Sequence, residues 1–247
     1  MNKLFLRKVS LKSPVQPSSY LKRLPVVACL EQGGISFERP VTFLVGENGS
    51  GKSTLLEAIA VAFGFNAEGG GKNFRFSTAD THSALASCLL LTKGVRMPSD
   101  GFFLRAESFY NVASYLDGLG PEALSCYGDI SLHAQSHGES FLTLVNERFS
   151  SKGLYILDEP EAALSPTRQM ALLARIHALA EAGSQFLIAT HSPMLMACPG
   201  ATVYQLDGQG VHPCSYAETE HYIVMRSFLN NPQRMLDILL SDAQDGE

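Results

Sequence analysis

Residues 46–53 constrain this chain more than any other stretch, because they match the G-x-x-x-x-G-K-[ST] pattern at each fixed position. The residues are Gly46, Glu47, Asn48, Gly49, Ser50, Gly51, Lys52 and Ser53. Residues 41–45 before them are β-branched and apolar, which predicts a buried strand, and residues 54–63 after them have the apolar spacing of a helix. A chance glycine-rich turn is the alternative, but it would not explain this strand and helix. The sequence therefore predicts a phosphate-binding loop between a strand and a helix.

The residue types of this loop suit a nucleotide. Glycines allow the backbone to approach phosphate closely, and successive N–H groups then point at the anion. The amino terminus of the following helix, which begins with Thr54, adds partial positive charge. We expect Lys52 to reach the β- and γ-phosphates of ATP and the Ser53 hydroxyl to help hold Mg²⁺. ATP and Mg²⁺ are therefore the predicted ligands of residues 46–54.

Two carboxylates follow a predicted strand further along the chain. Residues 154–157 are apolar, and Asp158 and Glu159 come directly after them. A carboxylate at a strand end beside a phosphate loop completes Mg²⁺ coordination in nucleotide-hydrolysing folds. We expect Asp158 to contact Mg²⁺ through water and Glu159 to orient or deprotonate the attacking water. An ordinary acidic loop after a core strand is the alternative.

Composition narrows the class of protein. The chain has 247 residues, of which 45% are hydrophobic and 17% charged, so one large α/β domain with a sizeable core is expected. The net charge of −5 argues against a strong non-specific nucleic-acid binder. Basic residues gather between positions 3 and 23, which we interpret as a solvated strand edge and loop; a contact for nucleotide, nucleic acid or a partner is the alternative. No apolar run approaches a membrane span, and scattered cysteines suit a reducing cytoplasm, so we expect a cytoplasmic protein without direct membrane insertion.

The order of predicted elements indicates a P-loop α/β fold. Residues 1–64 are predicted to form strands that lead to the phosphate loop and its helix, with a hairpin-like turn at 32–34. Residues 154–157, 168–182 and 185–190 are predicted as strand, helix and strand. This alternation predicts a mostly parallel sheet flanked by helices. An antiparallel N-terminal β part and a small helical sub-domain complete the predicted fold class.

Three further landmarks stand in a fixed order around these motifs. Residues 135–139 read Gln-Ser-His-Gly-Glu, residues 163–165 read Ala-Leu-Ser, and His191 stands in Thr-His-Ser-Pro at 190–193. Together with the phosphate loop and the Asp-Glu pair, this ordered set resembles ABC-type ATPases. The phosphate loop and the Thr-His-Ser-Pro segment are similar to those of the chromosome-maintenance and recombination-repair branch, and of small stand-alone bacterial ATPases. The tail at 218–222 is also similar to that small family, in which it has no role known to us.

The resemblance implies a homodimer with two ATP molecules sandwiched between its chains. Ser136, Gly138 and Glu139 stand at the family's signature, just before a predicted helix at 140–149. The amino terminus of that helix would form a second anion site for the γ-phosphate held by the other chain. His137 replaces a glycine of the family pattern, and Glu139 replaces a glutamine.

The resemblance also implies the remaining site residues. His191 would hydrogen-bond a phosphate oxygen or the attacking water, and it completes a catalytic set with Lys52 and Glu159. The family's glutamine-bearing loop corresponds to residues 101–107, where Glu107 is the candidate substitute as a third Mg²⁺ ligand beside Ser53 and Asp158. The other six histidines are interpreted as structural.

The base of ATP would need an aromatic side chain to stack against. Tyr20 is the candidate, and an N-terminal arginine or lysine is the alternative.

The sequence thus predicts an ATP-binding, Mg²⁺-dependent ATPase that works as an ATP-dependent homodimer. A single domain, 1–247, would consist of a nucleotide-binding core at 1–64 and 150–247 and a helical signature sub-domain at 65–149. An effector protein and a link to nucleic-acid metabolism or defence fit this interpretation. The alternatives are the energy-supplying subunit of a membrane transporter, against which the altered signature counts, and a nucleotide-gated binding module. A small-molecule kinase would explain neither the signature nor His191.

Overall fold

The computed structural model describes residues 4–71, 84–106, 109, 111, 113, 114 and 136–241. Its main feature is a six-stranded sheet in which five strands run parallel and β9 is an antiparallel edge. In sheet order the strands are β5 (Asp100–Arg105), β6 (Gly153–Asp158), β7 (Gln185–Ala189), β3 (Val41–Val45), β8 (Thr202–Asp207) and β9 (Gly210–Cys214). The predicted fold class is therefore confirmed.

Burial on both faces explains why these strands are continuously apolar. In β3, Val41, Phe43 and Val45 belong to one hydrophobic cluster, whereas Leu44 belongs to the cluster on the other face. A parallel sheet covered on both sides needs apolar side chains at successive positions. A buried Asp158 at the end of β6 is therefore exceptional, and its position indicates a site.

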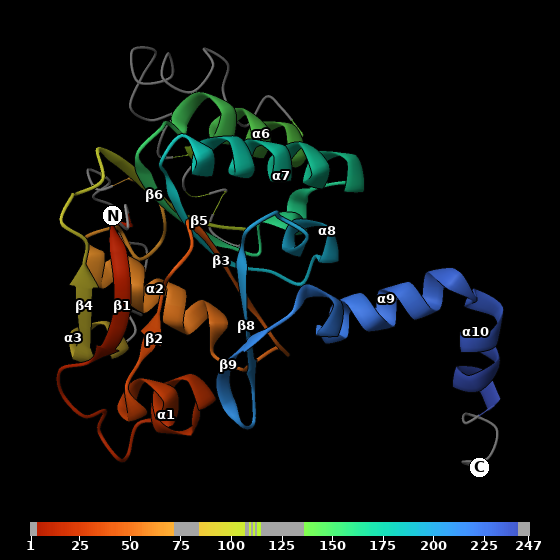
Figure 1. The fold of residues 1–247 in the computed structure, drawn as a ribbon, viewed down its shortest axis with the longest axis horizontal. Coiled ribbons are helices and arrows are strands. Elements are labelled where there is room, and N and C mark those ends of the chain that lie inside the picture. Colours follow the sequence, from red (N-terminus) through yellow and green to blue (C-terminus); the bar gives the residue numbers. More distant parts are fainter. Residues whose placement is uncertain are drawn as a thin grey trace.

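Helices cover the two faces of the sheet (Figure 1). One face carries α6 (His137–Arg148), α7 (Pro166–Glu181) and α8 (Pro193–Met196), whose buried side chains share a cluster with the sheet. The other face carries α1 (Pro25–Gln32), α2 (Lys52–Phe63) and α3 (Leu85–Cys88). The antiparallel part consists of β1 (Leu6–Leu11), β2 (Ile35–Ser36) and β4 (Leu89–Lys93) in the order β2-β1-β4.

The N-terminal segment differs from the prediction of strands alone. A 3₁₀ helix, η1 (Tyr20–Arg23), and α1 precede β2. Pro25 supplies the fixed φ that favours a first helical position, and the helix buries three apolar side chains, Val26, Val27 and Leu30. The turn predicted as hairpin-like ends α1 instead. Gly34 has a φ of 85°, and a Cβ there would lie 2.1 Å from the Val9 carbonyl oxygen, so glycine is required.

The segment 65–149, predicted as a helical sub-domain, contains two strands. β4 pairs with β1 in the small sheet, and β5 pairs with β6 in the large one. Its described helices are α3 and α6. Much of the segment lies outside the described residues, including residue 135 of the signature stretch.

The described chain ends in an arm, formed by α9 (Glu220–Asn230) and α10 (Pro232–Ser241), which projects from the body (Figure 1). Neither helix has a buried residue, whereas Thr219 at the N-cap of α9 is fully buried. The arm exposes large apolar side chains, among them Val224, Leu229, Ile238, Leu239 and Leu240. Among the described helices, none has both the length and the apolar character that crossing a bilayer requires.

Candidate functional site

The phosphate-loop residues join the end of β3 to the start of α2, as predicted. Gly49 and Gly51 have φ of 82° and 97°, in the left-handed region that glycine adopts without strain. A Cβ on Gly49 would meet nothing within 4 Å, so the loop has open space on that side. α2 begins at Lys52, two residues before the predicted helix start, and no side chain caps its amino terminus. Its first N–H groups therefore have no partner within the helix and face the loop.

The Lys52 side chain is buried and lies along the inside of the loop. Its Nζ donates to the carbonyl oxygens of Gly46, over 2.7 Å, and of Glu47, over 2.9 Å. Burial lowers the pKa of Lys52, and the negative charges of Glu159, Asp158 and Glu161 oppose that lowering. A buried cation placed among carboxylates suits a position beside a polyphosphate.

Asp158 connects the phosphate loop to the end of β6. Ser53 Oγ donates to Asp158 Oδ1 over 3.0 Å, and Arg105 Nε lies 3.4 Å from Asp158 Oδ2. Arg105 is the last residue of β5 and stands opposite Asp158 in the sheet register, and it also pairs with Glu57 over 2.9 Å. The two residues predicted to hold Mg²⁺ are thus in direct contact. The third, Glu107, lies outside the described residues.

Glu159 has an unusual backbone conformation. Its φ is 51° and its ψ 51°, and among the described non-glycine residues only Lys152 shares a positive φ. This left-handed conformation costs a residue with a side chain on the order of 1–3 kcal/mol, and such strain is concentrated at functional sites. It directs the half-exposed Glu159 carboxylate toward His191, whose Nε2 lies 3.6 Å from Glu159 Oε1.

His191 lies at the end of β7 and is held from two sides. Its backbone N–H donates to Glu161 Oε1, and its ring Nδ1 is 2.8 Å from Nε2 of His221. Burial, and then the charge of Lys52, lowers the pKa of His191, while Glu159 opposes this. Burial also raises the pKa of Glu161, which lies in η4 (Pro160–Ala163). A largely neutral imidazole is the consequence at neutral pH.

The signature residues lie at the amino terminus of α6, which begins three residues before the predicted start. Ser136 and Glu139 are exposed, but Gly138 is buried, and a Cβ there would lie 2.7 Å from Arg168 Nη1. Ser136 Oγ donates to Glu139 Oε2 over 2.7 Å, and Arg168 Nη2 donates to Glu139 Oε1 over 2.8 Å. The hydrogen bond from Ser136 Oγ is the main cause of a lowered pKa of Glu139. The structure therefore presents Ser136 at the surface and covers Gly138 with Arg168.

A cavity beside the phosphate loop brings several predicted residues together. Asn48, Lys52, Ser53, Thr54 and Glu159 line it, together with Tyr20 from η1. The Tyr20 side chain is 67% exposed, so its ring is free to accept a planar group. Glu47 and Asn48 line a second cavity on the other side of the loop, which His191 and the arm complete.

Three residues near the phosphate loop were not identified from the sequence. Arg105 follows from the pairing of β5 with β6, and this strand order was not predicted. Glu161 is only two residues beyond Glu159 but carries no motif of its own. His221 was interpreted as structural together with the other histidines, whereas the fold brings it into contact with His191.

The described residues fit Mg²⁺ and a polyphosphate. The hydroxyl of Ser50 in the loop is buried and has no hydrogen-bond partner among the described residues, and the α2 amino terminus is uncapped. Ser53 and Asp158 offer the hydroxyl and carboxylate oxygens that Mg²⁺ prefers.

Family models match two separate parts of the chain. A model of the "AAA domain" family matches residues 27–90, which contain the phosphate loop. A second model, described as "AAA domain, putative AbiEii toxin, Type IV TA system", matches residues 140–197, which contain Asp158, Glu159 and His191. A search of curated protein sequences found no match.

One solved structure shares the fold at low sequence identity, and two others align with lower TM-scores. "An inward-facing conformation of a putative metal-chelate type ABC transporter" aligns with a TM-score of 0.51 and 16% identity, covering 91% of this chain and 88% of the other. CbiO1 from Clostridium perfringens, part of the ABC transporter complex cbiONQ, aligns at 0.49 and 18%, covering 96% and 99%. The SMC head domain from Thermotoga maritima aligns at 0.46 and 16%, covering 86% and 100%. The chain thus resembles ABC-type ATPases in its motifs, and the first alignment shows the shared fold.

Proposed function

We propose that this chain hydrolyses ATP to ADP and phosphate with Mg²⁺. The observation that carries the proposal is the order of three neighbouring strands, β6-β7-β3. Their carboxyl ends place Asp158 and Glu159, His191 and the phosphate loop at one edge of the sheet. In open α/β sheets this is the edge at which ligands bind.

The residues suit in-line attack of water on the γ-phosphate. The loop N–H groups and Lys52 bind the phosphates and offset their charge. Ser53 and Asp158 would hold Mg²⁺, which would supply further neutralisation of the phosphate charge. The Glu159 carboxylate accepts the proton of the attacking water as the bond from the γ-phosphorus to the bridging oxygen breaks. His191 Nε2, which is close to Glu159, is placed to donate to a γ-phosphate oxygen.

The proposal includes a pair of chains with ATP between them. Ser136 is exposed at the amino terminus of α6, so a second chain can reach it. Gly138 has no side chain to contribute, and Arg168 and Ala163 fill the space that a Cβ there would occupy. We propose the whole chain as one ATPase domain, in which Glu107 is a further Mg²⁺ ligand.

Phosphate release tests the hydrolysis. Lys52→Ala is expected to reduce the ATPase rate of the purified chain at least about a hundredfold, because it removes the cation at the developing charge. Glu159→Gln should reduce kcat similarly while ATP binding is retained. Lys12→Ala, an exposed lysine on the N-terminal side, and Glu147→Gln on α6 serve as matched controls. Release that is unchanged by Lys52→Ala would show that the measured activity comes from elsewhere.

Mass measurement in solution tests the pairing. The Glu159→Gln chain is expected to shift from monomer to dimer with saturating Mg²⁺-ATP, and to stay monomeric with ADP. Ser136→Glu in the same background should abolish the shift, because it places a negative charge at the predicted γ-phosphate contact. A monomer at saturating ATP would contradict the sandwich arrangement.

We also propose a link to nucleic-acid metabolism or defence. It is supported by the AAA-domain model whose description includes a toxin–antitoxin system. Proteins that co-purify with the Glu159→Gln chain would identify an effector, and ATPase assays with and without DNA or RNA would show whether nucleic acid stimulates the chain. Recovery of a membrane-spanning partner would instead support a transporter role.

A further inference from the structure

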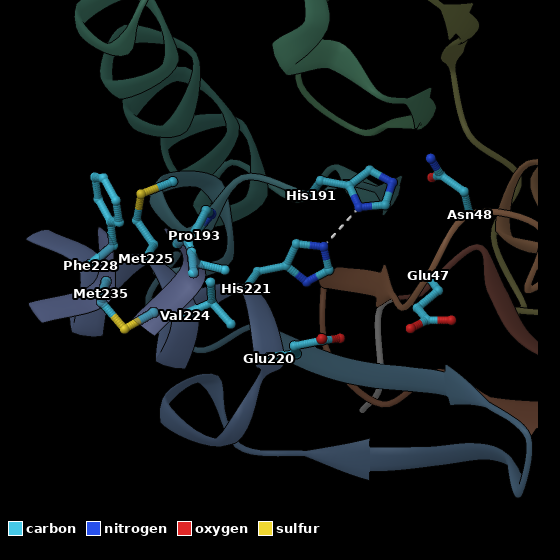
Figure 2. A pocket seen from close by; sticks show the side chains of 11 residues that line it. Glu47, Asn48, His191, Pro193, Glu220, His221, Val224, Met225, Phe228 and Met235 are labelled. Carbon is cyan, nitrogen blue, oxygen red and sulfur yellow. Dashed lines mark hydrogen bonds between the residues drawn. The ribbon is translucent and has the colours of Figure 1, made fainter. Parts of the chain in front are cut away.

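Two histidines are in contact between the arm and the sheet edge that carries the phosphate loop. His221, in the first turn of α9, places Nε2 at 2.8 Å from Nδ1 of His191, and Figure 2 shows the two rings linked by this hydrogen bond. His191 Nε2, on the far side of its ring, has no hydrogen-bond partner among the described residues and almost no exposed surface. It lies 3.6 Å from Glu159 Oε1. One ring nitrogen of His191 is therefore held by His221, and the other is buried beside the Glu159 carboxylate.

The groups that His191 Nε2 would contact determine which tautomer His191 needs. A γ-phosphate oxygen and the Glu159 carboxylate are both acceptors, so His191 must carry its proton on Nε2 to interact with them. A neutral His191 then has a bare Nδ1, which must accept a hydrogen bond. Nε2–H of His221 is the group in position to donate it. The partner of one ring nitrogen thus sets the state of the other.

We propose that His221 is a positioning residue that holds His191 in its Nε2-protonated tautomer and fixes its ring toward Glu159. The proposal rests on the proposed ATP hydrolysis. His221 does not touch the reacting atoms itself. In this arrangement His221 carries its proton on Nε2, and its buried Nδ1 is an acceptor without a partner among the described residues.

The anchoring of α9 keeps His221 in place. Thr219 is fully buried, and its Oγ1 donates to the Tyr216 carbonyl oxygen over 2.8 Å. The rings of Tyr216 and Tyr222 are in contact, with centroids 4.6 Å apart. No residue of α9 or α10 themselves is buried. The orientation of the arm and that of His191 are therefore linked through His221.

Substitution of His221 tests the proposal through the split between kcat and KM. His221→Leu removes both hydrogen-bonding nitrogens, and kcat should fall about ten- to a hundredfold with KM for ATP nearly unchanged. His221→Gln places an amide that can donate to Nδ1, and it should restore most of the rate. The matched control is His212→Gln. His212 lies on β9, near Asp207 at the end of β8. A kcat of His221→Leu within twofold of the unaltered chain would overturn the proposal.

A double variant separates positioning from a merely structural role. If His221 acts through His191, the variant with both His191→Ala and His221→Leu should be no slower than His191→Ala alone. Multiplicative losses would indicate an independent role and would contradict the proposal.

Nitrogen NMR of the imidazoles gives a readout that does not need turnover. The unaltered chain should show His191 protonated on Nε2, and His221→Leu should give a mixture of tautomers. An Nδ1-protonated His191 in the unaltered chain would reject the proposal even if the chain does not hydrolyse ATP. Failure of the proposed function itself would appear separately, as unaltered chain without ATPase activity.

Discussion

Ser53 Oγ donates a hydrogen bond of 3.0 Å to Asp158 Oδ1, although 105 positions separate the two residues in the sequence. This contact places the hydroxyl and the carboxylate where a single cation can reach both. Arg105 Nε lies 3.4 Å from the other carboxylate oxygen, so Ser53 and Arg105 contact the two oxygens of Asp158 separately.

Asp158→Asn should raise the Mg²⁺ concentration for half-maximal ATPase activity by about tenfold or more. The substitution preserves shape but removes the charge. The hydrogen bond that a Mg²⁺-bound water would donate to the Asp158 carboxylate is one to a charged group, which contributes about 1.5–3 kcal/mol. Titration of activity with Mg²⁺ at saturating ATP measures the effect. Asp207→Asn at the end of β8 should leave the Mg²⁺ curve unchanged, and an equal shift in both variants would contradict the assignment.

Glu159→Gly should be more stable than Glu159→Ala by about 1 kcal/mol, although both should lack activity. Alanine retains the cost of the left-handed backbone, whereas glycine does not. Urea unfolding of the two variants measures the difference. The same pair at Lys152, which shares a positive φ, should show the same sign. A higher stability for the alanine variant would show that the strain is absent in solution.

The histidine pair should make a contribution to stability that rises with pH through the range just below 6.5 and levels off above it. Burial lowers the folded-state pKa of His191 and His221, so between that pKa and 6.5 the unfolded chain binds more protons. The charged groups around this pair include Lys52 and three glutamates (Glu159, Glu161 and Glu220). Urea unfolding at several pH values measures the slope.

The double variant His191→Gln and His221→Gln provides the control for this slope. It removes both lowered pKa values while the surrounding glutamates remain. Its stability should therefore depend less on pH below 6.5, and an unaltered slope would assign the effect to other groups.

Tyr20→Ala should raise KM for ATP by about tenfold with little change in kcat. Stacking of a base on an aromatic ring contributes about 1–3 kcal/mol, and the Tyr20 ring lies in the cavity beside the phosphate loop. Tyr20→Phe keeps the ring and should behave like the unaltered chain. If Tyr20→Ala has no effect on KM, the base binds elsewhere.

The elements that could be predicted are those whose information is local. Strand β3, the loop and α2 are specified by apolar residues and glycines within one short segment, and the predicted strand 41–45 is confirmed. The strand before Asp158 was predictable because both of its faces are buried. Helix starts were less accurate, since α2 and α6 begin two and three residues before the predicted positions.

What could not be predicted depends on contacts between distant segments. α1 is short, and its apolar residues resemble those of a strand until the small sheet behind it is known. The pairing of Arg105 with Asp158 follows from β5 lying next to β6, and the contact of His221 with His191 follows from the path of the chain after β9. No spacing of residues in the sequence indicates either contact.

The Glu139–Arg168 pair has a consequence for how a cycle of the proposed dimer would end. In a chain that is not paired with another, the Glu139 carboxylate already lies at the amino terminus of α6. A phosphate from a second chain would compete with this carboxylate. ATP brings a γ-phosphate to this competition, and ADP brings none. In the proposed dimer, separated chains would then be the resting state, and loss of the γ-phosphate would favour a return to it.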